Sequence, residues 1–324
     1  MKKTVSLLLV ILLVLCAAAY TFGDGQSDTN VIRLGGLTGP TTMSMAGLLR
    51  NNEAGTARNR YEFTLAGTAD ELTPLFVKGD LDMISCPVNL GSVLYNKLGG
   101  GVTMLAVNTL GVLYILEKGG ETVLTPADLK GRTIYATGKG STPEYTLRFL
   151  LSGCGLDPDL DVVIEFKSEP AEIVAQMEVM DSAVCMLPQP YVTAALGKLS
   201  DTRIALDVTE EWGKVSPTAL ITSAVFVRSD FLEAHPETVA LFMQDLSESV
   251  AFVNGTPEEA AAVIGGYGIV NEAVARKAIP YCHIVYLTGG EMKAAAEAWL
   301  GLLLEEKAAS VGGALPQEGF YYQP

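Results

Sequence analysis

The clearest candidate for binding chemistry is a short glycine-rich segment, Gly138-Lys139-Gly140-Ser141-Thr142, which comes just before an amphipathic stretch. Its two glycines let backbone N–H groups converge, and Ser141 and Thr142 add hydroxyl groups. The N-terminus of the following helix adds positive potential. This combination suits a carboxylate, sulfonate or phosphate, with Lys139 adding charge if it points inward. The alternative is a capped helix with a solvated lysine, and the spacing is not that of a P-loop.

Four other polar segments follow predicted strands. Ligands of open α/β sheets bind outside the carboxyl ends of the strands, so polar residues there are predicted to bind ligand. Each also has a structural explanation, because Thr and Asn often cap helices, and Asp70 is the expected cap beside the second segment. Gln189 and Tyr191 could bond to a planar ligand or simply begin an exposed helix. The predicted ligand-binding residues are Thr41, Thr42, Thr68, Asn89, Ser141, Thr142, Gln189 and Tyr191.

The sequence shows no clear pattern of a catalytic site or a metal site. The chain has two histidines, His235 and His283, which stand alone and are expected to be structural. Its five cysteines show no C-x-x-C or C-x-x-H spacing, which excludes the usual zinc patterns. No Gly-x-Ser-x-Gly segment occurs with a well-placed histidine and aspartate. We therefore expect no catalytic residue, no metal and no cofactor. Buried free thiols are the expected state of the later cysteines, with one disulfide left open.

Composition narrows the classes of protein further. Of the 324 residues, 49% are hydrophobic, which excludes a disordered chain, and the length predicts about two domains. Asp and Glu number 37 against 22 Lys and Arg, a formal net charge of -15. Such a chain offers no general basic surface, so no nucleic-acid partner is expected.

The first residues are predicted to direct export. Lys2 and Lys3 precede an apolar run that ends near Cys16, and three alanines follow it. This is the pattern of a signal peptide, here residues 1–23, and the run is shorter than a membrane-spanning helix. Leu13-Val14-Leu15-Cys16 is similar to a lipoprotein cleavage box, although Leu15 departs from it. A freely exported protein and a lipoprotein anchored at Cys16 both remain open.

The rest of the chain alternates short apolar runs with amphipathic stretches, which predicts an α/β fold with mostly parallel sheets. Two crossings, near 111–117 and 217–223, predict an inserted domain. Lobe 1 would comprise residues 30–113 and 220–324, and lobe 2 residues 114–219. The predicted strands are 31–35, 61–65, 82–85 and 102–107, then 132–136, 162–166, 183–186 and 203–208, then 220–227, with helices only beyond.

Five local patterns carry a resemblance to a known family: Ile32–Pro40, Lys78–Met83, Ala127–Ile134, Gly138–Pro143 and Pro188–Tyr191. Their order and spacing resemble the extracellular solute-binding proteins of ABC importers, in the sulfonate, nitrate and thiamine-pyrimidine group. The resemblance covers nearly the whole chain after the signal peptide. It implies a two-lobed type II periplasmic-binding-protein fold with a two-stranded hinge. It also implies a monomer, periplasmic or a cell-surface lipoprotein, that delivers a small molecule to an ABC permease and its ATPase.

One departure and two alternatives accompany this resemblance. Family members often carry Glu where Gln189 stands, which puts in doubt a cationic ligand that such a carboxylate would pair with. An extracytoplasmic sensor module that presents ligand to a membrane receptor is one alternative function. A thiamine-pyrimidine-synthase-like enzyme is the other, but the chain lacks the cysteine-rich iron-binding run of those enzymes. The ligand itself stays open between an anion and a neutral heteroaromatic molecule.

Overall fold

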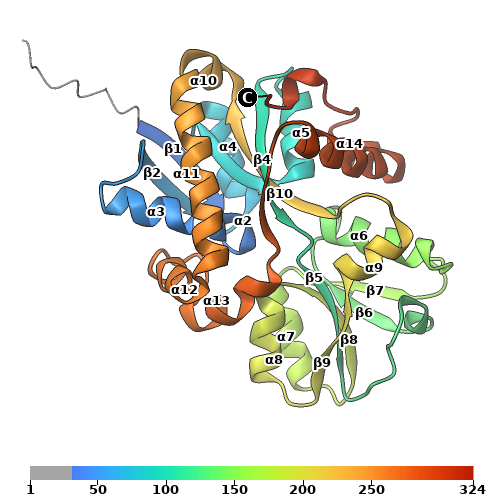
Figure 1. Ribbon diagram of the computed structural model, residues 1–324. Coiled ribbons are helices and arrows are strands. Elements are labelled where there is room, and N and C mark those ends of the chain that lie inside the picture. The colour runs from blue at the N-terminus through green and yellow to red at the C-terminus, as the bar shows by residue number, and fades with distance from the viewer. Residues whose placement is uncertain (1–30, 324) are drawn as a thin grey trace, which may run out of the picture. The chain divides into compact units, whose positions relative to one another are not determined.

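The computed structural model describes residues 31–323, so the predicted signal peptide and Cys16 lie outside the described residues. Two β-sheets form the framework (Figure 1). The six-stranded sheet has the order β11-β4-β10-β3-β1-β2 and the five-stranded sheet the order β7-β6-β8-β5-β9. We call the layers around them lobe 1 and lobe 2. The strands are β1 (Val31–Leu37), β2 (Arg60–Ala66), β3 (Met83–Pro87), β4 (Val102–Leu110), β5 (Leu113–Lys118), β6 (Thr133–Ala136), β7 (Val163–Phe166), β8 (Ala183–Pro188), β9 (Thr202–Asp207), β10 (Ile221–Arg228) and β11 (Ile284–Leu287).

Helices cover both sheets. Some begin at a cap or proline and end near a glycine that the sequence offers, as α4 does between Thr68 and Gly79. They are α2 (Pro40–Met43), α3 (Ala46–Glu53), α4 (Ala69–Lys78), α5 (Val88–Lys97), α6 (Thr142–Gly153), α7 (Pro170–Glu178), α8 (Tyr191–Lys198), α9 (Val208–Val215), α10 (Ser229–Ala234), α11 (Pro236–Gly255), α12 (Pro257–Gly266), α13 (Glu272–Ala278) and α14 (Gly289–Glu306).

Strand β4 lies between β10 and the edge strand β11 of the six-stranded sheet, and all its residues except Leu110 are buried. Met104 packs in the same apolar cluster as Trp299 of α14, whereas Leu105 packs in the cluster that contains Phe242 of α11. Neighbouring residues of a strand point to opposite faces, so helices cover both faces of this sheet. A strand covered on both faces reads as a continuous apolar run.

The prediction of mostly parallel sheets is wrong. Strand β1 is parallel to β2 and β3, and β6 is parallel to β7 and β8. Strand β10 is antiparallel to β3 and β4, and β5 is antiparallel to β8 and β9. The prediction of helices only after residue 227 is also wrong, because β11 pairs with β4. Its four residues are too few to show a strand period in the sequence.

The chain passes between the lobes where β4 leads into β5 and where α9 leads back to β10 (Figure 1). A third segment, just before β11, also lies at this junction. The Tyr114 hydroxyl donates to the Tyr281 carbonyl at 3.1 Å, and His283 Nδ1 lies 2.5 Å from the Gly111 carbonyl oxygen. Since a carbonyl only accepts, Nδ1 carries the proton there. The lobe limits at 113/114 and 219/220 stay predictions.

An aromatic group joins the lobes on the side of α14. The Trp212 and Trp299 rings, from α9 and α14, have centroids 5.3 Å apart. Phe149 of α6 packs on Trp212 at 4.4 Å, and the Trp212 indole N–H donates to the Thr218 carbonyl at 2.8 Å. Both tryptophans are almost fully buried, so burial of apolar area helps to hold the lobes together here.

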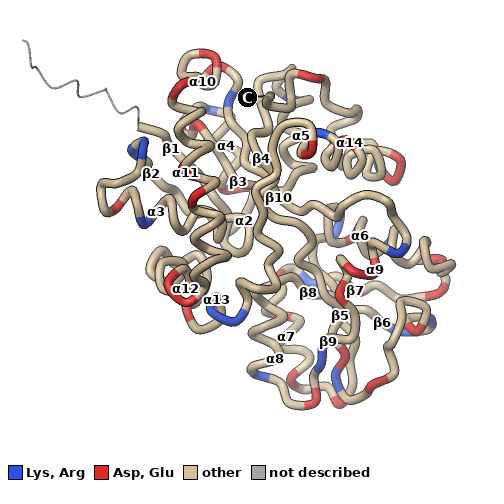
Figure 2. The backbone as a smooth tube through the Cα atoms, in the orientation of Figure 1, with Lys and Arg blue, Asp and Glu red and all other residues tan. Residues whose placement is uncertain are grey.

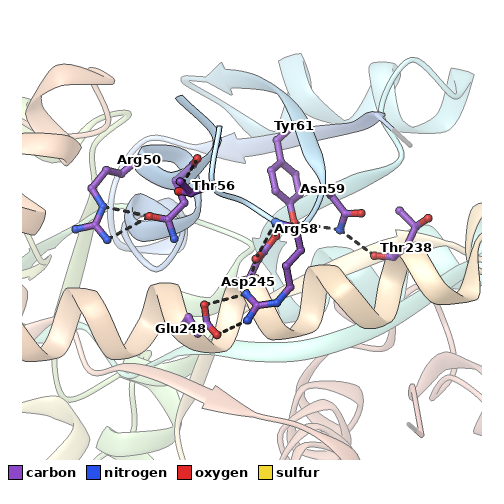
Figure 3. Close-up of polar contacts among 9 residues, drawn as sticks. Arg50, Thr56, Arg58, Asn59, Tyr61, Thr238, Asp245 and Glu248 are labelled. Atoms are coloured by element: carbon purple, nitrogen blue, oxygen red, sulfur yellow. Dashed lines mark hydrogen bonds and ion pairs between the residues drawn. The ribbon is translucent and has the colours of Figure 1, made fainter. Parts of the chain in front are cut away.

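A polar cluster ties the segment before β2 to α11 (Figure 3). Asp245 accepts hydrogen bonds from Arg58 and from the Tyr61 hydroxyl, and Asn59 bonds to Tyr61 and to the Thr238 carbonyl. Because Asp245 is almost completely buried, its charge depends on these donors for stabilisation.

Candidate ligand-binding cleft

A cavity of about 230 Å³ is lined from both lobes. It lies at the carboxyl ends of β1 and β8, which is where ligands bind in α/β sheets. Of the eight predicted ligand-binding residues, Tyr191 lines it. Lobe 1 contributes Thr38, Gly39, Ile269, Val270, Asn271 and Val274, and lobe 2 contributes Pro190, Tyr191 and Ala194.

The lobe 1 wall consists of two loops joined by backbone hydrogen bonds. The Thr38 N–H donates to the Ala66 carbonyl at 3.0 Å, and the Gly39 N–H donates to the Ile269 carbonyl at 3.3 Å. Gly39 has φ 104°, a conformation that favours glycine, so the turn out of β1 requires it. No local sequence pattern identifies Ile269 or Asn271 as a binding residue, because only this long-range pairing brings their loop to the cleft.

A buried amide fixes the turn after β1. Asn108, in the middle of the β4 apolar run, is 0% exposed. Its Nδ2 donates to the Thr41 carbonyl at 2.8 Å and lies 2.9 Å from the Ser44 and Ser85 hydroxyls. Its Oδ1 accepts from the Ser223 hydroxyl at 2.8 Å. Each polar atom of this amide is satisfied, which rigidifies the loop above it. A lone Asn inside an apolar strand was the available sequence signal.

Thr41 and Thr42 hold the same turn. Their hydroxyls donate to the Leu37 carbonyl at 3.2 and 2.6 Å. Thr42 is completely buried, whereas Thr41 is half-buried. The Thr42 hydroxyl is therefore used within the turn, although no side chain caps α2. Thr41 keeps a partly accessible side chain beside the cavity-lining Gly39.

Thr68 is the N-cap of α4. Its hydroxyl accepts the Glu71 N–H at 3.4 Å, and the Glu71 carboxylate accepts the Gly67 N–H at 2.8 Å. This is a capping box, and Thr68 is exposed. The cap is therefore Thr68 and not Asp70, and Thr68 does not line the cavity.

Asn89 and Thr142 meet across the two lobes. The Thr142 hydroxyl at the start of α6 donates to Asn89 Oδ1 at 3.2 Å, and Asn89 Nδ2 donates to the Ser310 carbonyl at 3.3 Å. Both side chains are buried. The structure thus brings two predicted binding residues together as partners of each other, in a bond that exists only while the lobes are in contact.

The glycine-rich loop before α6 has its own acceptors. Gly138 and Gly140 have φ 76° and 75°, as expected for this turn. The Ser141 hydroxyl donates to the Gly138 carbonyl at 2.7 Å, and the Gly140 N–H donates to Glu144 Oε2 at 2.6 Å. Lys139 is exposed, with Nζ 5.9 Å from the Phe166 ring centroid. The Glu144 carboxylate therefore accepts the Gly140 N–H, which the sequence predicted to be a donor to an anionic ligand.

Of the last predicted pair, Tyr191 lines the cavity and Gln189 does not. Gln189 is 1% exposed, and its Oε1 accepts the Thr193 N–H at 3.3 Å and the Thr193 hydroxyl at 2.8 Å. Burial raises the pKa of the Tyr191 phenol, and the nearby charge of Glu169 raises it further. Tyr191 therefore stays a neutral hydrogen-bonding group at physiological pH.

Metal and redox chemistry remain without support in the described part of the chain. No group of three or more His, Cys, Asp and Glu side chains there could hold a metal ion. Cys86, Cys154, Cys185 and Cys282 are free thiols, and burial raises the pKa of Cys185 to about 12. Between residues 31 and 323, no helix combines the length and apolar character needed to span a membrane.

The comparisons with known proteins agree with this geometry. An ABC transporter structure from Parabacteroides distasonis is 25% identical, with a TM-score of 0.77 over 90% of this chain and 99% of that one. The periplasmic aliphatic sulphonate binding protein of Escherichia coli is 17% identical, with a TM-score of 0.72 over 91% and 92%. The alkanesulfonate-binding protein of Xanthomonas axonopodis pv. citri, bound to MOPS, is 17% identical, with a TM-score of 0.66 over 90% and 96%.

These likenesses confirm the predicted two-lobed α/β fold class. No curated protein sequence shows a significant match. The model of the NMT1-like family matches residues 101–265, slightly more than half of the chain. The chain therefore belongs to the NMT1-like family.

Proposed function

We propose that this protein is an extracytoplasmic solute-binding protein, which captures a small molecule between its lobes and delivers it to an ABC permease and its ATPase. The observation that carries the proposal is the cavity lined from both lobes at the carboxyl ends of β1 and β8. The similar proteins from E. coli and X. axonopodis, named as sulfonate-binding proteins, support it. Binding is its role, rather than catalysis.

Lobe closure is the proposed working step. A ligand that contacts Thr38 or Asn271 on one lobe and Tyr191 on the other is bound more tightly when both walls are present. Ligand therefore shifts the population toward the closed form, which the permease can recognise. The bond between Asn89 and Thr142 stabilises the same form, because its two ends belong to different lobes.

The proposal also covers the residues that contact the ligand, the oligomeric state and the attachment to the membrane. We propose Gln189 and Tyr191 as the main polar contacts from lobe 2, with Thr41, Ser141 and Thr142 at the margin of the site. The mature protein acts as an exported monomer. Cys16 provides a lipid anchor if it, and not a later residue, is the cleavage site.

The test asks whether a variant with a blocked cavity still binds the ligands that the wild type binds. Residues 24–324 are screened by thermal shift against sulfonates, carboxylates, pyrimidines and amino acids. A ligand at 100 times its Kd adds about 2.7 kcal/mol of stability, which is easily detected. Ala194→Trp places a large ring in the cavity and should abolish the shift given by every hit.

The matched control is Ala171→Trp, an exposed site on α7 of the same lobe. It should leave every shift in place. Hits that survive Ala194→Trp would show that the solute binds elsewhere, and the proposal would then lose the cavity that carries it.

A further inference from the structure

The cavity wall is uncharged. All nine lining residues are neutral, and five of them are Pro, Ala, Ile or Val. Figure 2 shows the charged residues concentrated on the outer helices and loops of both lobes. A buried anion needs a cation or several hydrogen-bond donors to offset the loss of hydration. The wall provides no cation for this purpose.

Three N–H groups around the cleft already have side-chain acceptors. At α8 the Thr193 N–H donates to Gln189 Oε1, and at α13 the Ala273 N–H donates to Asn271 Oδ1 at 3.0 Å. Before α6 the Gly140 N–H donates to Glu144. N–H groups at helix starts are what usually bind anions in such folds. These three groups donate to side chains of the protein instead.

The charged groups near these loops offer an anion no free cation on the cavity wall. Glu144 of α6 is 8% exposed and pairs with Arg148 at 3.0 Å, and Glu169 is close enough to Tyr191 to raise its pKa. Lys139 lies over the Phe166 ring. Lys277 is one turn from Val274 on α13, but it is exposed and does not line the cavity. No lysine or arginine among the lining residues could therefore balance an anion.

The polar groups that remain suit an uncharged ligand. Tyr191, Thr38 and Asn271 line the cavity and carry groups that both donate and accept hydrogen bonds. A volume of about 230 Å³ is below the roughly 300–1,000 Å³ of sites for drug-sized molecules.

We propose that the solute is a small uncharged molecule, recognised by hydrogen bonds and apolar contact, and that anions such as sulfonates and nitrate are excluded. This inference rests on the proposed function. This selectivity differs from the sulfonate named for the similar proteins of E. coli and X. axonopodis. Its source is the uncharged wall, together with the loop N–H groups that already donate to side chains of the protein.

The experiment compares ligands of equal shape and different charge. Calorimetry on residues 24–324 measures Kd for nitrate and for pairs of alkyl or aryl compounds, in which a neutral amide or sulfonamide is matched with the corresponding carboxylate or sulfonate. Benzamide with benzoate and methanesulfonamide with methanesulfonate are two such pairs. The neutral member of each binding pair should bind at least ~100-fold more tightly than the anion.

Lys277→Gln serves as the control. It removes an exposed cation of α13 and should alter no Kd, because Lys277 does not line the cavity. An anion that binds more tightly than its neutral partner would overturn the selectivity and leave the binding function intact. If no member of either class binds at millimolar concentration, the cleft is not the solute site, and both proposals fail.

Discussion

Asp245 provides a quantitative prediction about stability. Its carboxylate side chain is 1% exposed and lies on α11, facing the segment before β2 (Figure 3). It accepts hydrogen bonds from Arg58 Nη1 at 2.9 Å, the Arg58 backbone N–H at 3.1 Å and the Tyr61 hydroxyl at 2.6 Å. Desolvation of this carboxylate is therefore offset by three donors, two of them from one arginine.

Asp245→Ala removes the acceptor and leaves its donors in place. Removal of one partner from a buried ion pair costs about 3–5 kcal/mol. The Arg58 side chain is 34% exposed and keeps Glu248, so water and that carboxylate compensate part of the loss. Tyr61 is 4% exposed and loses its acceptor outright. We expect the free energy of unfolding to fall by about 3 kcal/mol, at the lower end of that range.

The assay is urea unfolding of residues 24–324, followed by circular dichroism. Glu248→Gln is the matched control, because Glu248 pairs with the same guanidinium at 2.5 Å but its side chain is 57% exposed. Its loss should have no measurable effect, since water solvates both groups. Asp245→Asn keeps the side-chain volume and serves if the alanine variant does not fold. A loss under ~1 kcal/mol for Asp245→Ala, or equal losses for Asp245 and Glu248 variants, would refute the reasoning.

Two further predictions concern lobe 2 and α4. Burial would raise the pKa of Glu117, but hydrogen bonds from Thr122, the Val123 N–H and Arg203 outweigh it and lower the pKa from 4.5 to about 2. The ionised form thus stabilises the fold above pH 4.5, and this contribution fades as pH falls toward 2. In thermal melts, the Glu117→Gln variant should be less stable than the wild type at pH 7, and the two stabilities should converge in acid. Exposed Glu121→Gln is the control, and a stability difference that persists at pH 2 would contradict this prediction. Thr68→Ala should lower the free energy of unfolding by about 1 kcal/mol through loss of the cap, whereas Thr68→Ser should retain it, and equal melting curves for all three proteins would exclude the capping role.

Much of the local structure could be predicted from the sequence. Gly79 after Lys78 ended a helix as expected, and the strands at 31–35 and 61–65 were each found within two residues. These features depend on caps, turns and periodicity within a few residues, which tertiary contacts rarely override. The short β11 was missed, because only its pairing with β4 makes it a strand.

The candidate site was only partly predictable. The rule that ligands bind at the carboxyl ends of strands led to Tyr191, which lines the cavity. The same rule could not tell that Thr68 is a cap or that Thr142 bonds to Asn89, 53 residues away. A hydroxyl or amide can serve a helix, a neighbouring lobe or a ligand, and its choice depends on what folding places within about 3 Å.

The sequence by itself determined most of the order of strands and helices, the α/β class and the resemblance to binding proteins, because each follows from local pattern. Only the tertiary structure decided which groups remain free for a ligand. It paired the Gly140 N–H with Glu144 and the Thr193 N–H with Gln189 Oε1, and it brought the loop at Ile269 to the turn after β1. The physical reason is that hydrogen-bond partners and burial depend on contacts between distant segments, which no local pattern specifies.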